Sequence, residues 1–170
     1  YEAIFARRSV RKYKASEINK KTMDDIQSYL KNIKQLDGQN ARFQIVAGKE
    51  IGENHPYAIL AYCDANDSAY VNVGYVLEKM DLYLQSIGLG SLWLGMAKPA
   101  EKQQDFCIML VFGETEMPFR KSGQDFNRLP IKEISDSDQA LASAARLAPS
   151  SVNSQPWKIH FEDGKISISY

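Results

Sequence analysis

Residues 71–95 read VNVGYVLEKMDLYLQSIGLGSLWLG, and this stretch decides the fold. Apolar residues recur in its first part at steps of three and four, which is typical of a helix with one buried face. They are Val73, Val76, Leu77, Met80, Leu84 and Ile87. Gly88 is placed to take the left-handed turn that closes such a helix. The stretch therefore predicts a central helix over 71–87, followed by a Gly-rich buried strand.

Short runs rich in β-branched and aromatic residues lie on both sides of this helix. They cover 42–47, 57–63 and 106–112, and their polar or glycine boundaries are typical of strands. A helix with Asn19 as its N-cap is expected over 20–33. Strands and helices interleave without strict alternation, which predicts an α+β fold with a mixed or antiparallel sheet and packed helices.

The C-terminal part predicts one more helix and a hairpin. The helix is expected over 136–147, opened by Ser135 with Asp138 as a capping box and stopped by Pro149. The hairpin is expected to turn at Asp163 and Gly164. This helix-loop-strand order faintly repeats the one that begins near residue 17, and the chain is interpreted as one domain, 1–170, with half-domains of about 1–125 and 126–170. A chance similarity of two helix-strand units is the alternative.

Composition excludes several classes of protein. The 170 residues are 44% apolar and 25% charged, which is unlike a disordered chain. Lys+Arg and Asp+Glu both number 21, so no whole-protein charge favours nucleic acid. The longest apolar run, 106–112, is far below the roughly 20 residues that cross a bilayer. Cys63 and Cys107 lie in separate apolar stretches, which favours reduced core thiols in a cytoplasmic protein over a disulfide or metal pair.

A basic run near the N-terminus is the first candidate site. Arg7, Arg8, Ser9 and Arg11 offer guanidinium forks and a hydroxyl, which match the geometry of a phosphate group. A solvated basic face, or a patch that binds nucleic acid or a partner, is the alternative. The hydroxyl among the arginines favours anion binding, because a simple charged face has no need of it.

A polar loop before the hairpin is the second candidate. Pro149, Ser150, Ser151, Asn153 and Gln155 combine a restrained backbone with hydrogen-bond donors and acceptors, as recognition of a planar polar heterocycle requires. A plain helix-to-strand loop is the alternative.

Three further features complete the candidates. The segment Leu92, Trp93, Leu94 and Gly95 could form an apolar wall against an aromatic ring. Arg128 could add a phosphate contact. His55 and His160 lack partners at ligand spacing, so no metal site is predicted.

Two of these segments resemble signatures of the nitroreductase family of flavin-dependent oxidoreductases. Residues 4–13 are similar to its Arg-Arg-Ser-x-Arg-x-aromatic motif, and residues 148–157 are similar to its Pro-Ser-x-x-Asn-x-Gln-Pro-Trp motif. Gly88–Gly95 and 126–131 resemble shorter family segments. In ordinary members the second motif follows the first long helix, whereas here it follows residue 147.

The resemblance implies FMN as the cofactor and NAD(P)H as the electron donor. It implies that the arginine segment binds the phosphate and ribityl groups, that the polar loop faces the isoalloxazine ring, and that Leu92–Gly95 covers the other side. Hydride would pass through flavin N5 to a nitroaromatic, quinone or similar acceptor by a ping-pong mechanism, with no catalytic side chain. A non-catalytic flavin-binding or flavin-sensing protein is the alternative.

The order of the two motifs resembles that in a divergent branch of the nitroreductase family, in which one chain contains two half-domains. The protein is then expected to be a monomeric pseudo-dimer or a homodimer, with one flavin site per chain. An equivalent of the central helix is expected after Tyr170, so the chain is interpreted as truncated at its C-terminus.

Overall fold

The computed structural model describes residues 2–51, 55–99, 103–137 and 139–170. They form two compact units. The sheet unit holds residues 8–118, and the terminal unit holds residues 2–7 together with 119–170. The boundary between the compact units follows Pro118, and the first residues belong with the C-terminal part; the half-domain boundary near residue 125 stays a prediction.

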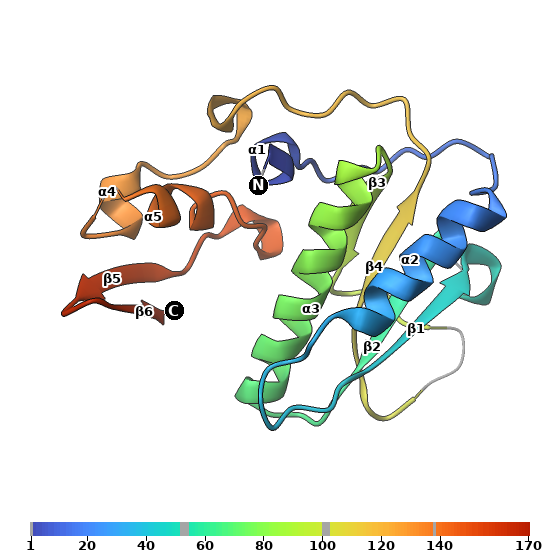
Figure 1. The fold of residues 1–170 in the computed structure, drawn as a ribbon, viewed down its shortest axis with the longest axis horizontal. Coiled ribbons are helices and arrows are strands. Elements are labelled where there is room, and N and C mark those ends of the chain that lie inside the picture. Colours follow the sequence, from blue (N-terminus) through green and yellow to red (C-terminus); the bar gives the residue numbers. More distant parts are fainter. Residues whose placement is uncertain (1, 52–54, 100–102, 138) are drawn as a thin grey trace. The chain divides into compact units, whose positions relative to one another are not determined.

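The sheet unit is built on four antiparallel strands in the order β1-β2-β4-β3 (Figure 1). Their bounds are Arg42–Ala47 for β1, Tyr57–Tyr62 for β2, Gly90–Leu94 for β3 and Phe106–Gly113 for β4. A 3-10 turn, η1, follows β1 at Gly48–Glu50. These strands confirm the three predicted runs to within a residue, and the Gly-rich segment forms the expected additional strand.

Two helices pack on the sheet, α2 at Lys20–Asn32 and α3 at Asp67–Ser86. They share one core with it, in which Ile26 of α2 and Leu77 of α3 meet Leu110 of β4. The Asn19 side chain caps α2, and Gly88 has φ +83° after α3; both confirm the sequence analysis.

The central helix begins four residues earlier than the predicted position 71. The Asn66 side chain accepts a hydrogen bond from the Ala69 amide at 3.0 Å and so fixes the start at Asp67. The polar capping residue precedes the first apolar residue of the buried face, so hydrophobic periodicity alone places the start of the helix too late.

One irregularity brings the two cysteines together. Ala61 pairs with Ile108, but Tyr62 pairs with Phe106, so Cys107 is an extra residue in β4. Cys63 follows β2 directly, and it packs against the same core cluster and lines the same cavity as Cys107. Both cysteines are free and partly buried against the core, which confirms the expectation of reduced core thiols; although far apart in the sequence, they share one face of the sheet.

The terminal unit contains short elements. Helix α1 spans Glu2–Ala6, α4 spans Ile131–Ile134, α5 spans Ala140–Ala145, and 3-10 turns η2 and η3 span Gly123–Asp125 and Ser151–Asn153. The predicted hairpin is confirmed as β5, Lys158–Glu162, and β6, Lys165–Ser169. Asp163 and Gly164 both have positive φ, as the tight two-residue turn requires.

The single helix expected over 136–147 is wrong. Ser135 is extended, with φ −139° and ψ 149°, and forms a parallel bridge with Ile159 of β5. The Asp136 carboxylate accepts a hydrogen bond from the Phe161 amide at 3.2 Å. These tertiary contacts hold 135–136 against the hairpin, and the helix begins only at Ala140. Asp138, proposed for the capping box, lies outside the described residues.

Candidate functional site

The arginine-rich segment is divided between the two units after Arg7. Arg7 belongs to the terminal unit, where its amide donates to the Ala3 carbonyl at 2.8 Å and its carbonyl accepts from the Arg120 guanidinium. Arg8, Ser9 and Arg11 belong to the sheet unit. The four predicted phosphate-binding residues are therefore supported by two separate scaffolds.

In the sheet unit, the backbone of residues 8–10 is fastened to β3 and α3. The Val10 amide donates to the Ser91 carbonyl at 2.8 Å, and Ser9 forms a parallel bridge with Ser91. The Arg8 amide donates to Gln85 Oε1 at 2.6 Å. A Cβ at Gly90 would lie 2.8 Å from Val10, so glycine permits the close approach. Backbone groups of the segment make these bonds, so the bonds themselves do not use its side chains.

The guanidinium groups of this segment differ in what they contact. Arg8 Nη1 donates to the Pro118 carbonyl at 2.8 Å. Arg11 is exposed, and within the described part of the chain no hydrogen bond or ion pair engages its guanidinium. Arg11 is thus a cation whose donors remain available to an anionic ligand.

A buried polar network supports this segment, and the sequence analysis did not predict it. Asp81 of α3 is fully buried, and its Oδ1 accepts from Gln85 Nε2 at 2.7 Å and from the Ser91 hydroxyl. Its Oδ2 accepts from Trp93 Nε1 at 3.0 Å. Gln85 Nε2 also donates to Ser91 Oγ at 2.8 Å. The network connects α3 and β3 to the amide of Arg8, and it therefore positions the arginine segment.

The sequence contained a signal for this network. Asp81 and Gln85 are spaced i, i+4, and each directly follows a buried residue of the apolar stripe, Met80 and Leu84. Polar residues within a buried helix face need partners, because an unpaired buried polar group is costly.

Burial and the negative charge of Asp81 also raise the pKa of Tyr13. The Tyr13 hydroxyl therefore stays protonated, and it donates to the Val10 carbonyl at 2.8 Å.

The predicted apolar wall is divided by the pleat of β3. Leu92 and Leu94 pack in the core on the side of Met109 and Val111. Trp93 packs on the opposite face, with its indole bonded to Asp81. Gly95 is exposed beyond the end of the strand. A flat ligand on one side of β3 would therefore contact only one of these sets.

In the terminal unit, the polar loop has an unusual backbone. Val152, Asn153 and Gln155 have φ of +46°, +59° and +49°. This left-handed region is unfavourable for residues other than glycine, and most of all for a β-branched side chain such as Val152, which is 97% exposed. Surrounding contacts must hold the loop in this conformation.

Arg128 supplies several of those contacts. Its Nη2 donates to the Leu147 and Ala148 carbonyls at 3.0 and 2.9 Å, and its Nη1 donates to Asn153 Oδ1 at 2.6 Å. Such a use of both ends of the guanidinium fork is a positioning role. The phosphate contact suggested for Arg128 remains a prediction.

The amide side chains of the loop are also used internally. Asn153 Nδ2 donates to the Asn127 carbonyl at 3.0 Å, and Gln155 Oε1 accepts from the Leu129 amide at 2.8 Å. The Gln155 amide donates to Ser150 Oγ at 3.0 Å. Ser151 is exposed, and the buried Trp157 Nε1 has no partner among the described residues. Pro149 lies partly buried at the start of the loop.

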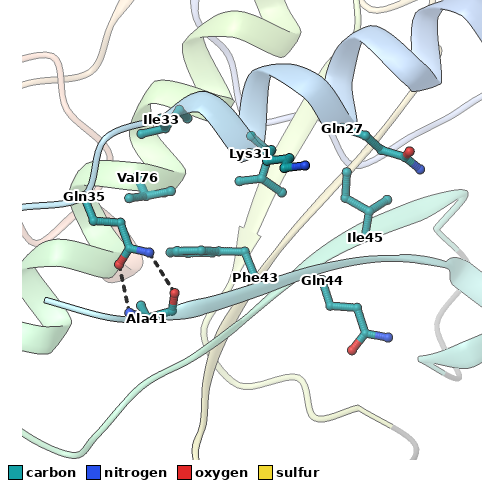
Figure 2. Close-up of a pocket in the computed structure, with 10 residues that line it drawn as sticks. Gln27, Lys31, Ile33, Gln35, Ala41, Phe43, Gln44, Ile45 and Val76 are labelled. Carbon is teal, nitrogen blue, oxygen red and sulfur yellow. Dashed lines mark hydrogen bonds between the residues drawn. The ribbon is translucent and has the colours of Figure 1, made fainter.

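A cavity of about 490 Å³ lies between α2 and β1 of the sheet unit (Figure 2). The Gln35 side chain bonds both the amide and the carbonyl of Ala41 there, at 2.8 and 2.9 Å. None of the predicted site residues lines this cavity.

The described residues contain no group of three or more His, Cys, Asp or Glu side chains arranged to hold a metal ion. No described helix has the length and apolar character needed to cross a bilayer.

An antiparallel sheet covered by α2 and the long α3, with an arginine segment fastened at its edge, defines an α+β fold of the nitroreductase type. The family model described as "Putative TM nitroreductase" matches residues 1–170, so the chain belongs to this nitroreductase family.

Solved structures share the fold. A "putative nitroreductase" from Thermotoga maritima has a TM-score of 0.78 and 25% identity, covering 99% of this chain and 74% of that one. A nitroreductase family protein from Clostridium difficile has a TM-score of 0.66 and 18% identity, covering 81% and 97%. A "putative nitroreductase" in complex with FMN, from Desulfovibrio desulfuricans, has a TM-score of 0.56 and 18% identity, covering 78% and 92%. No curated protein matches the sequence.

Proposed function

We propose that this protein is an FMN-dependent oxidoreductase that transfers electrons from NAD(P)H to a small acceptor such as a nitroaromatic compound or a quinone. The observation that carries the proposal is the family match over the whole chain. It is supported by the relative of the same fold that was solved with FMN. FMN, when bound, would supply hydride chemistry in two half-reactions, with the donor leaving before the acceptor binds.

The residues of the sheet unit fit the charged end of this cofactor. Arg11 is an exposed cation, and its backbone neighbours Ser9 and Val10 are fixed on Ser91. An arginine on a fixed backbone binds a phosphate with little loss of conformational entropy. We expect Arg11 to supply the main phosphate contact, with Arg8 and Ser9 beside it.

The residues of the terminal unit fit the flat end. In the loop, the exposed Ser151 hydroxyl is available to a ligand, whereas Asn153 and Gln155 are largely occupied by the loop itself. The unpartnered Trp157 indole N–H is a buried donor that a ligand or a water molecule would satisfy. We therefore assign Asn153, Gln155 and Arg128 to shaping the loop, and Ser150 and Ser151 to contacting the ring.

The oligomeric state and the cellular compartment of the protein are also part of what we propose. We expect one FMN per chain, in a cytoplasmic protein that is a monomeric pseudo-dimer or a homodimer. The residues assigned to FMN come from both units, Arg8, Ser9 and Arg11 from the sheet unit and Ser150 and Ser151 from the terminal unit.

The decisive experiment measures flavin binding and turnover. The purified protein should show the visible spectrum of FMN, lose that colour on addition of NADH or NADPH without oxygen, and regain it with a nitroaromatic compound or a quinone. Bound FMN that NAD(P)H never bleaches would instead indicate a flavin-binding or sensing protein. A colourless protein that binds no added FMN would contradict the proposal.

Arg11→Ala tests the phosphate assignment. It should weaken FMN binding by about 1.5–3 kcal/mol, the usual contribution of a charged hydrogen bond. Lys12→Ala, a neighbouring exposed cation, is the matched control and should change the affinity far less. The measurement is fluorescence titration of FMN with each variant. Equal affinities in the two variants would remove Arg11 from the phosphate site.

A further inference from the structure

The neighbouring cysteines Cys63 and Cys107 are not among the residues assigned to the flavin. Both belong to the sheet unit, at the end where β2 finishes and β4 begins. The Cys63 amide donates to the Asp105 carbonyl at 2.9 Å, which extends the β2–β4 pairing by one residue. The two cysteines therefore sit on neighbouring, fixed segments of backbone.

The β-bulge determines where the Cys107 side chain points. Along a regular strand, neighbouring side chains alternate between faces. In β4 the extra residue interrupts this alternation: Cys107 and Ile108 pack against the same core cluster as Cys63, whereas Phe106 packs on the other face. Bulges commonly re-aim a side chain in this way. Without the bulge, Cys107 would face away from Cys63.

Solvent and small molecules can reach this pair. Cys63 lines two neighbouring cavities of about 510 and 440 Å³, and Cys107 lines the second. Asp64 and Asp105 line both cavities, and Arg42 pairs with Asp105 at 3.2 Å. Cys63 is thus the more accessible of the two sulfur atoms.

We infer that Cys63 and Cys107 form a redox-active dithiol that closes to an intramolecular disulfide by exchange with a low-molecular-weight disulfide. The Cys63 thiolate attacks one sulfur of the reagent, forms a mixed disulfide and expels one thiolate. The Cys107 thiolate then attacks the Cys63 sulfur and expels the second. The protein loses two electrons and two protons, and the reagent gains them as two thiols.

The surroundings set the rate of this exchange. Burial raises the pKa of Cys63, and the Asp64 and Asp105 carboxylates raise it further, whereas the hydrogen bond with Cys107 opposes them. Burial and the neighbouring Cys63 raise the pKa of Cys107 to about 12. Since only the thiolate attacks, the pair is slow to oxidise at neutral pH, and the rate should rise about tenfold per pH unit. The carboxylates should also favour a cationic disulfide over an anionic one.

The test uses the complete purified chain, with any cofactor that it carries. It is treated with cystamine, a cationic disulfide, at pH 7, 8 and 9. Intact mass and free thiols are then measured. The wild-type protein should lose both thiols and two hydrogen atoms, carry no adduct, and recover with dithiothreitol. Glutathione disulfide, which is anionic, should give the same product more slowly.

Two serine variants separate the roles of the cysteines. Cys107→Ser should stop at a single cysteamine adduct on Cys63, and Cys63→Ser should react far more slowly. Adducts on both wild-type cysteines, or a reaction that occurs only in urea, would overturn the inference. If a variant fails to fold, the wild-type protein is treated with phenylarsine oxide instead. One molecule of the reagent should block both thiols. Reaction of each thiol with its own molecule, or no reaction, would exclude a dithiol.

Discussion

The two segments assigned to the flavin are stabilised in different ways. The 8–11 segment is fastened by backbone bonds to β3 and rests on the buried Asp81 network. Among the described residues the 148–157 loop has no sheet partner of that kind, and it keeps a strained backbone through side-chain bonds, chiefly those of Arg128. The first should therefore fail only with the sheet unit itself, whereas the second should be sensitive to one guanidinium.

The largest effect is expected from Asp81→Ala. This change removes the acceptor of three donors in a site without exposure to water. The free energy of unfolding should fall by about 3–5 kcal/mol, because buried donors are left unpaired. Urea unfolding followed by tryptophan fluorescence measures it.

Asp81→Asn is the matched control, because it keeps the shape and one acceptor oxygen. Its loss should be clearly smaller. A loss below about 1 kcal/mol for Asp81→Ala would show that the network does not support the arginine segment.

An intermediate effect is expected from Arg128→Ala. The Leu147 and Ala148 carbonyls and the Asn153 side chain lose their donor, at a cost of about 1.5–3 kcal/mol for a charged hydrogen bond. Amide exchange should accelerate across 148–156 and stay unchanged in β1–β4. Arg128→Lys keeps the charge but not the fork, and should accelerate exchange almost as much. Full protection in both variants would mean that the loop holds its shape without this residue.

The smallest effect is expected from Val152→Gly. It relieves a left-handed φ in a β-branched residue, and the greater freedom of glycine in the unfolded chain offsets part of the gain. A net stabilisation of about 0.5–1 kcal/mol should raise the melting temperature. Ser151→Gly, whose φ is not positive, should instead lower it. A lower melting temperature for Val152→Gly would indicate that the side chain makes a contact that its exposure does not reveal.

Local sequence signals were sufficient for much of the fold. The β-branched runs predicted β1, β2 and β4, and Asp163-Gly164 predicted the hairpin, because each depends on neighbours in the sequence. The arginine run and the proline-bounded loop were likewise visible as motifs. That the arginine run and the loop bind the same ligand is still a prediction.

The remaining features depend on contacts between distant residues. The bulge at Cys107 adds one residue to a pairing that periodicity does not specify, so sequence patterns do not predict that Cys63 and Cys107 share one face of the sheet. The break at Ser135 arises from the hairpin that follows it. The partners of Arg128 in the loop, two carbonyls and an asparagine about 20 residues away, cannot be identified from composition.

The bridge between Ser9 and Ser91 has a consequence for self-association. β3 is the outermost strand of its sheet, and an uncovered outer strand is a template for pairing with another molecule. The arginine segment occupies that position and carries charge that repels a second copy. Proteolytic removal of the N-terminal residues should therefore cause aggregation.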